Sequence, residues 1–246
     1  MLLLNKIKVE NANALNGIIH GIPAITGFLG FVHALQRNTG INMDGAAIIF
    51  HKYELHKGTP SRNVIYENTR NKINEHIVNA AYIDFTVSLL IDCDIEDKTL
   101  LKAIKKKINT MRIAGGDIVN IKEVTIEDNS NKIKEKLGGG FILFDKNNDI
   151  NKYEGKDNLD KMITACNTAD YIPLAVGFRA LTECSNSIEN VRDNDTPSTF
   201  VEQLYGLGKF ESIKDIDSFN SLFWRYKYED KLYICTQYLK GIAEAA

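Results

Sequence analysis

The residues best suited to do chemistry gather between His20 and Arg37. Thr26, Gly30, His33 and Arg37 are three or four positions apart, which places them on one stripe of a helix. A helix start whose first turn carries Gly and Thr, with His33 and Arg37 further along the same side, suits a phosphate or an RNA backbone. The simpler alternative is tight packing of a helix on a sheet, with His33 a half-buried polar residue.

Two glycines interrupt this predicted helix. Gly27 and Gly30 each cost about 1 kcal/mol relative to alanine in a helix interior. We therefore expect another group to approach the helix backbone closely at these positions. The helix itself is predicted from an apolar face of Phe28, Leu29, Val32 and Leu35.

Enzymatic chemistry has little support in the sequence. The chain has no phosphate-binding Gly-x-x-x-x-Gly-Lys-Ser/Thr loop, no Gly-x-Ser-x-Gly elbow and no His-Glu-x-x-His motif. No spaced acidic cluster predicts a metal site, and we expect no cofactor and no metal. A ribonuclease remains the enzymatic alternative, because five histidines lie in the first third of the chain: His20, His33, His51, His56 and His76.

Composition indicates an ordinary globular protein with separated charges. Of 246 residues, 44% are hydrophobic and 25% charged, enough for one large domain or two small ones. Residues 98–136 carry ten Lys or Arg against five acids, whereas residues 137–246 carry twelve against seventeen. Such a chain can bind nucleic acid on one face and a protein on another. Four distant cysteines and no long apolar run lead us to expect a cytoplasmic protein that does not bind membranes.

The hydrophobic pattern predicts an α+β fold. A βαββαβ order is typical of a ferredoxin-like or RNA-recognition-motif-like core, and we expect it over residues 1–136. A β-rich C-terminal subdomain is expected over residues 137–246, packed with the first as one compact unit. The expected strands are 2–10, 45–53, 80–91, 117–126, 141–144, 172–182 and 200–209, with helices near 28–37, 100–108 and 159–168. The basic loop 58–62 and the glycines at 138–140 are candidate RNA contacts.

Six ordered blocks carry a resemblance to a known family. Sequence 7–15 with the stretch 20–37 resembles the signature of the 5′-handle-binding subunits of type I-F CRISPR surveillance complexes. These are the Csy-type second subunits, which are Cas-five-like. The likeness continues at 111–116, 173–181, 190–197, 200–208 and 223–226.

The resemblance implies a non-catalytic subunit that binds the 5′ handle of the CRISPR RNA. It also implies pairing with the large subunit, contact with the backbone subunit, and access to target DNA through the assembled complex. In that family a separate subunit cleaves the guide precursor. The third alternative is a protein-interaction adaptor that makes no RNA contact.

The resemblance and the residue types together give the candidate site. Its members would bind phosphate, ribose and base edges, although Arg112 and Arg192 could instead form structural ion pairs. Phe223, Trp224 and Tyr226 are expected at the interface with the large subunit. The expected RNA-binding residues are Asn11, Asn13, Thr26, His33, Arg37, Arg112, Gly115, Gly116, Arg179, Arg192 and Arg225.

Overall fold

The structure is a computed structural model that describes residues 1–56, 61–69, 72–93, 95, 99–186, 188, 191 and 195–238. For residues 61–69 and 72–80 only the backbone is described. The basic loop expected at 58–62 lies largely outside the described residues.

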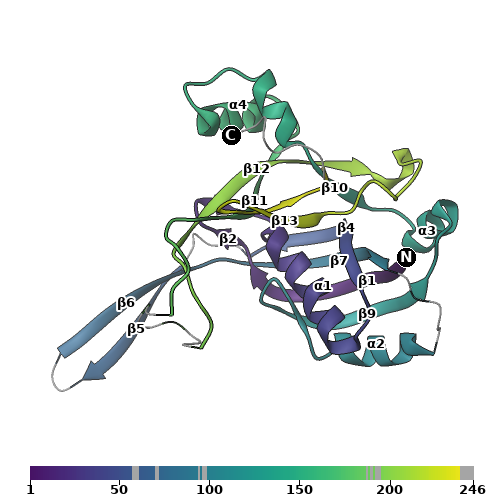
Figure 1. Ribbon diagram of the computed structural model, residues 1–246, viewed down its shortest axis with the longest axis horizontal. Helices are drawn as coiled ribbons and strands as arrows, with labels where there is room; N and C mark the ends of the chain where they lie inside the picture. The colour runs from purple at the N-terminus through teal and green to yellow at the C-terminus, as the bar shows by residue number, and fades with distance from the viewer. Residues whose placement is uncertain are drawn as a thin grey trace.

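One ten-stranded sheet forms the centre of the molecule (Figure 1). Its strand order is β13-β14-β11-β12-β10-β4-β7-β1-β9-β8. Strands β2 with β3 and β5 with β6 form two further ladders. The strands are β1 Leu2–Asn13, β2 Leu15–Asn16, β3 Ile19–His20, β4 Met43–Leu55, β5 Ser61–Thr69, β6 Lys72–Ala80, β7 Tyr82–Cys93, β8 Arg112–Ile113, β9 Gly116–Ile126, β10 Phe141–Asp145, β11 Ile172–Ala180, β12 Val201–Ser212, β13 Arg225–Glu229 and β14 Leu232–Thr236.

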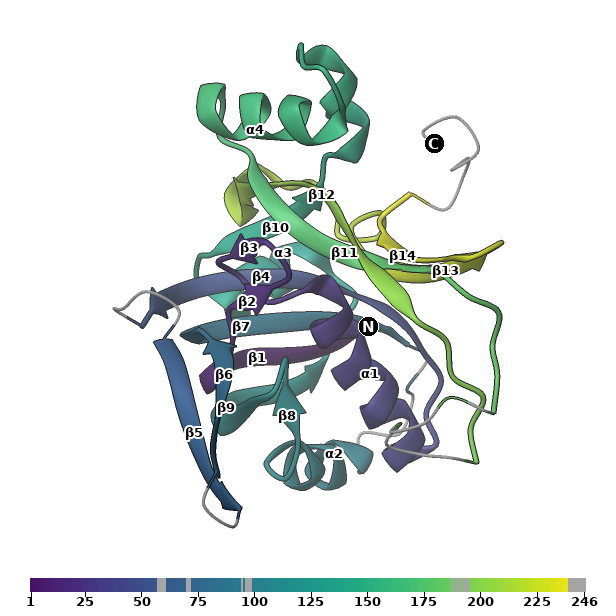
Figure 2. The same ribbon diagram turned by 90° about the vertical axis from the view of Figure 1, so that its left-hand side faces the viewer.

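The helices lie outside this sheet. Figure 2 shows α1 and α2 against the part of the sheet made by the first half of the chain, and α4 at the far end. The helices are α1 Ile25–Thr39, α2 Leu100–Ile108, α3 Ser130–Leu137 and α4 Asn158–Thr168, with short 3₁₀ turns η1 Asn147–Lys152 and η2 Ile213–Asp215.

Four neighbouring strands come from the first half of the chain, in the order β4-β7-β1-β9. Each neighbouring pair is antiparallel. Helix α1 connects β1 to β4, and α2 follows β7, so these elements have the predicted βαββαβ order in the sequence. The α+β class and the main strands of this region are confirmed.

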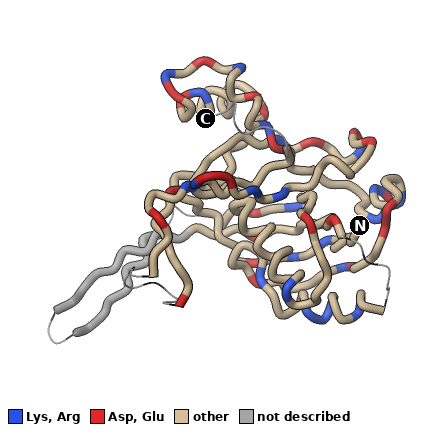
Figure 3. The backbone as a smooth tube through the Cα atoms, in the orientation of Figure 1, with Lys and Arg blue, Asp and Glu red and all other residues tan. Residues whose placement is uncertain are grey.

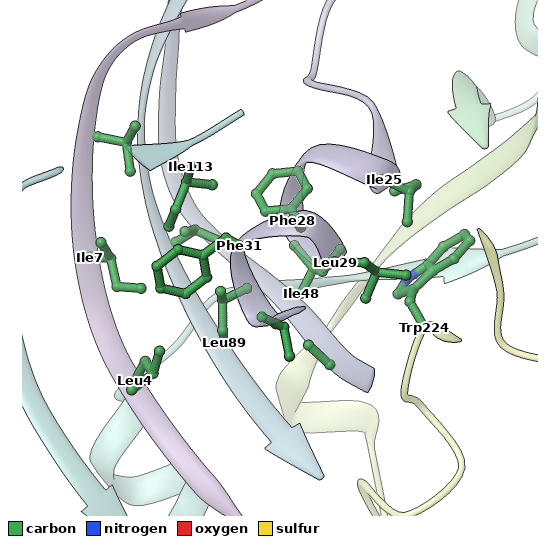
Figure 4. Packing of buried hydrophobic residues seen from close by; sticks show 14 of the residues in the cluster. Leu4, Ile7, Ile25, Phe28, Leu29, Phe31, Ile48, Leu89, Ile113 and Trp224 are labelled. Carbon is green, nitrogen blue, oxygen red and sulfur yellow. The ribbon is translucent and has the colours of Figure 1, made fainter. Parts of the chain in front are cut away.

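The largest hydrophobic core lies between α1, α2 and one face of the sheet. Figure 4 shows Phe28 and Leu29 of α1 packed near Ile48 of β4 and Trp224. Phe28 is fully buried and its ring centroid lies 5.8 Å from those of Phe50 and Phe85. Burying each such side chain contributes about 1.5–3 kcal/mol. The predicted apolar face of α1 is therefore confirmed.

A second core covers the opposite face of the sheet. Leu3 of β1, Ile49 of β4 and Leu90 of β7 pack there with Ile133 and Leu137 of α3. The segment that follows β12 adds Ile213, Phe219 and Phe223 to the same cluster. Side chains alternate along a strand, so neighbouring residues of β1 serve the two cores.

The structure adds elements that the sequence prediction lacked. Strands β5 and β6 pair as a long antiparallel ladder, and residues 130–137 form α3. The second half of the chain does not build a sheet of its own, because β10 pairs with β4 and joins the central sheet. The subdomain boundary predicted at residue 137 falls at the end of α3 and is crossed by this pairing.

Candidate nucleic-acid interface

An open pocket of about 500 Å³ lies beside the start of α1. It brings together Asn13, Thr26 and Gly115, three of the predicted RNA-binding residues, which come from β1, α1 and the β8–β9 turn. The rest of the lining is Leu15, Asn16, Gly17, Pro23, Ala24, Gly27, Ala114, Phe178 and Gln203. The lining therefore combines amides, one hydroxyl and glycine backbone with a comparable share of apolar side chains.

The first turn of α1 forms one wall of this pocket. Its N-cap residue is Ala24, so no side chain caps the first backbone N–H groups. The first turn also carries no acidic residue. A helix start without a side-chain cap leaves donors and the positive end of the helix dipole available to an anion.

The two helix glycines have different surroundings. A Cβ on Gly27 would lie 2.9 Å from the Ala114 Cβ and 3.1 Å from its Cα, so this glycine lets the 111–116 segment approach α1. At Gly30 no atom of the described residues lies within 4 Å of a Cβ. Packing inside the protein explains Gly27, whereas the space over Gly30 is open.

The Asn11 and Asn13 region is an irregular part of β1. Asn11 has φ of 57° and donates its backbone N–H to Asp84 Oδ1 at 2.9 Å. The Asn13 side chain binds the backbone of Leu15 on both sides, because its Nδ2 donates to the carbonyl and its Oδ1 accepts from the N–H. This local bonding uses part of the amide that was expected to contact RNA.

The predicted glycines of the 111–116 segment also differ from each other. Gly115 has φ of 82°, and no neighbour from the described part of the chain lies within 4 Å of a Cβ there, so its backbone faces open space. A Cβ on Gly116 would lie 2.8 Å from the Ala12 Cα, so Gly116 is required by packing against β1. Gly115 therefore lines the pocket, whereas Gly116 packs against β1 and is not part of the lining.

Most of the predicted arginines are ion-paired. Arg112 Nε lies 2.9 Å from Asp117 Oδ1, and Arg179 Nη1 lies 3.3 Å from Glu202 Oε1, both at the surface. Arg37 is exposed at the end of α1 and has no ion pair with the described residues. Arg192 lies outside the described residues.

Arg225 has a structural role. Its side chain is only 16% exposed and bridges Asp44, at 3.0 Å, and Asp92, at 2.6 Å. The guanidinium also lies over the Phe223 ring. These contacts connect β13 to β4 and β7. They also neutralise the Arg225 charge that was expected to contact RNA.

The expected aromatic interface cluster is divided by the fold. Phe223 is 2% exposed and Trp224 fully buried, with the indole N–H donating to the Leu143 carbonyl at 2.9 Å. Both belong to the protein core, which corrects their expected exposure at an interface. Tyr226 is 46% exposed, and its ring centroid lies 6.1 Å from that of His33 on α1.

The histidines proposed for a ribonuclease lie on separate elements. His20 and His33 are exposed on β3 and α1, while His56 contacts Asp84 at 2.9 Å. His51 is half-buried, with Nε2 2.7 Å from Ser88 Oγ. Burial, with a smaller contribution from nearby Lys6, lowers the pKa of His51 to about 4. The side chain of His76 is not among those described.

Positive charge gathers on α2 rather than at the pocket. Figure 3 shows basic positions along this helix at the lower edge of the molecule. Lys102, Lys105, Lys106 and Lys107 are exposed on it. Among the described residues no group of His, Cys, Asp and Glu could hold a metal ion. Within the same residues, no helix is long and apolar enough to cross a membrane.

Residues of the second half of the chain complete the pocket, and sequence reasoning missed them. Phe178 and Gln203 are direct partners across the β11–β12 ladder and both line the pocket. Tyr205 of β12 supports the opposite wall, because its hydroxyl accepts the backbone N–H of Ile18 at 3.1 Å. The blocks at 173–181 and 200–208 were the available signal, although only Arg179 was selected from them.

Fold and pocket together define an α+β protein with an open pocket whose lining combines polar and apolar groups. The sequence model of the family described as CRISPR-associated protein (Cas_Csy2) matches residues 2–171 and 161–235. The chain belongs to this family, and is thereby a subunit of a type I-F CRISPR Csy complex. It is similar to CRISPR-associated protein Csy2 of Pseudomonas aeruginosa (strain UCBPP-PA14), with 25% identity over 300 aligned positions that cover 93% of this chain and 92% of the relative.

Proposed function

We propose that this chain is the non-catalytic subunit that binds the 5′ handle of the CRISPR RNA in its complex. The observation that carries the proposal is the pocket beside α1, where Asn13, Thr26 and Gly115 meet an uncapped helix start. A helix start offers donors to phosphate, and exposed amide and glycine backbone offers bonds to ribose and base edges. The β4-β7-β1-β9 order supports a ferredoxin-like core of the RNA-recognition type.

The proposed partners follow from the family. The chain pairs with the large subunit, contacts the backbone subunit, and reaches target DNA through the assembled complex. Tyr226 remains the exposed aromatic residue of the expected interface cluster. The ribonuclease alternative has less support, because the described histidines lie on separate elements.

Handle binding is tested by comparing the handle RNA with a scrambled RNA of the same length across a salt series. The full chain in its complex should prefer the handle, with phosphate contacts adding a salt-dependent part. Arg37→Ala should weaken binding to both RNAs and flatten the salt slope by about 0.7, the value for one contact to a single strand. Lys161→Ala, a change on α4, is the matched control and should leave the slope unchanged.

Two outcomes would contradict the proposal. Equal affinity for handle and scrambled RNA would remove sequence-dependent binding at this pocket and favour the adaptor alternative. Specific cleavage of the RNA that is lost in His20→Ala or His33→Ala would instead favour the ribonuclease.

A further inference from the structure

Three strands, β11, β14 and β13, carry a line of aromatic side chains that begins beside Gln203 of β12 and leads away from the pocket. In the antiparallel ladders, Gln203 of β12 pairs with Phe178 of β11, and Phe178 pairs with Tyr233 of β14. Tyr233 in turn pairs with Tyr228 of β13. Residues directly opposite each other in an antiparallel ladder project from the same face of the sheet. These four side chains therefore form one row across the sheet.

A fifth side chain widens this row at its outer end. Tyr226 lies two positions from Tyr228 on β13, and its ring stacks on that of Tyr233 with centroids 5.6 Å apart and an interplanar angle of 25°. His33 of α1 lies beside Tyr226. We call Phe178, Tyr233, Tyr226 and Tyr228 the aromatic row.

The row becomes more exposed with distance from the pocket. Phe178 lines the pocket and is partly buried, as is Tyr233. Tyr226 is 46% and Tyr228 69% exposed on β13, which is an edge strand of the sheet. In Figure 2, β11, β14 and β13 lie side by side next to α1. The row is thus a surface that continues from the pocket to the sheet edge.

We propose that the aromatic row binds unpaired nucleobases of single-stranded RNA that leaves the pocket. The proposal rests on handle binding at the pocket and extends that site by a stacking surface. The exposed rings of Tyr226 and Tyr228 on β13 offer surfaces on which bases can stack, beyond the face of Tyr226 that packs on Tyr233. Stacking accepts every base, because each base has a π-face, so the row adds affinity without adding sequence preference.

Continuity with the pocket favours RNA over a protein as the occupant. Phe178 and Gln203 belong both to the pocket and to the line of paired residues, so a strand bound at the pocket meets the row directly. The exposed rings are also tyrosines, whose hydroxyl groups remain in water while the ring face stacks. A protein surface docked on the row is the other outcome of the test.

The experiment uses the full chain in its complex and three RNA probes of equal length. These are the handle RNA, a scrambled RNA, and an abasic oligonucleotide that keeps the phosphates and lacks the bases. Tyr226→Leu combined with Tyr228→Leu keeps apolar area and removes the rings. This variant should bind both base-containing RNAs more weakly, roughly 5- to 150-fold for each stacked base lost. Its affinity for the abasic oligonucleotide and its salt slope should not change, because stacking is not an ionic contact.

Two further variants control this result. Tyr226→Phe with Tyr228→Phe keeps both rings and should restore the wild-type affinity. Phe141→Leu removes a ring that is 55% exposed on β10, away from the row, and should bind all probes as the wild type does. 2-Aminopurine in the RNA should lose fluorescence quenching only in the double leucine variant.

Each contrary outcome has a distinct meaning. If the double leucine variant binds every RNA like the wild type, the row does not bind bases. If the double leucine variant instead loses another subunit of the complex during purification, the row is a protein interface and the proposal is wrong. If the wild type does not prefer the handle but the variant still loses affinity for base-containing RNA, handle binding fails while the stacking surface stands.

Discussion

At the scale of single residues, burial decides which side chains serve the fold and which remain available to ligands. Ser88 and Asn5 are fully buried, and the Ser88 hydroxyl donates to Asn5 Oδ1 at 3.1 Å. The same hydroxyl accepts the backbone N–H of Lys6 and lies 2.7 Å from His51 Nε2. A polar network in a core persists because each member has partners. His51 is therefore a structural residue, unlike exposed His33.

The lowered pKa of His51 predicts how stability depends on pH. The folded protein holds the His51 imidazole at a pKa of about 4, below its ordinary value of 6.5, so the unfolded chain takes up the proton first as pH falls. Its contribution is complete above pH 6.5 and is lost as pH falls toward 4. Allowing for the partial exposure of His51, we expect the free energy of unfolding to fall by about 1–2 kcal/mol over this interval.

Urea unfolding at several pH values tests this expectation, with His51→Gln as the comparison. The variant lacks the titrating group and should show a shallower decline between pH 7 and pH 4.5 than the wild type. Parallel curves for the two proteins would show that other groups cause the acid sensitivity.

At the scale of elements, helix α1 combines a structural and a candidate binding function. Its apolar side chains Phe28, Leu29 and Leu35 are buried against the sheet. The first turn of the helix forms one wall of the pocket. Ala114 occupies the space beside Gly27, while the space above Gly30 is empty. A single helix thus carries one glycine that packing requires and one that it does not.

This difference predicts opposite effects of two alanine substitutions. Gly27→Ala should destabilise the protein by about 1–3 kcal/mol, because the new Cβ meets the Ala114 backbone and helix propensity does not compensate. Gly30→Ala should stabilise it by about 0.5–1 kcal/mol through helix propensity alone. Chemical unfolding measures both. Destabilisation by Gly30→Ala would show that the helix glycine has a structural need that the geometry does not reveal.

Gly30→Leu extends the comparison from stability to binding. A leucine side chain over the open position should weaken handle RNA binding if the RNA passes close to the α1 backbone. Binding titrations with the variant complex measure this effect, and circular dichroism checks that α1 is intact. Wild-type affinity in a stably folded variant would place the RNA away from this part of the helix.

At the scale of the whole molecule, the second half of the chain completes the sheet of the first. β10 pairs with β4, and Trp224 forms an isolated bridge with Ala46 of the same strand. Arg225 adds ion pairs to Asp44 of β4 and Asp92 of β7. Gly45 has φ of 92°, and a Cβ there would meet the Trp224 carbonyl oxygen at 2.4 Å. The join therefore depends on residues from both halves.

Removing the Arg225 charge should weaken this join. Arg225→Met keeps much of the side-chain length but leaves Asp92 and Asp44 without their partner, so we expect a loss of about 1–3 kcal/mol in unfolding free energy. Hydrogen exchange should increase first in β13 and β14. Arg179→Met is the control, since its exposed pair with Glu202 should contribute less than about 1 kcal/mol. Equal effects of the two substitutions would contradict a structural role for Arg225.

The sequence by itself determined the α+β class, the apolar face of α1, the main strands and the family. The fold class and the elements follow from local hydrophobic periodicity. The family follows from six short blocks of sequence in a fixed order. Only the tertiary structure decided that Trp224 is core, that Arg225 is doubly ion-paired, and that Phe178 and Gln203 reach a pocket built by residues 13–27 and 114–115. The physical reason is that burial and strand pairing depend on contacts between distant parts of the chain. The local sequence around Trp224 is the same whether the side chain is buried beside β4 or exposed to solvent.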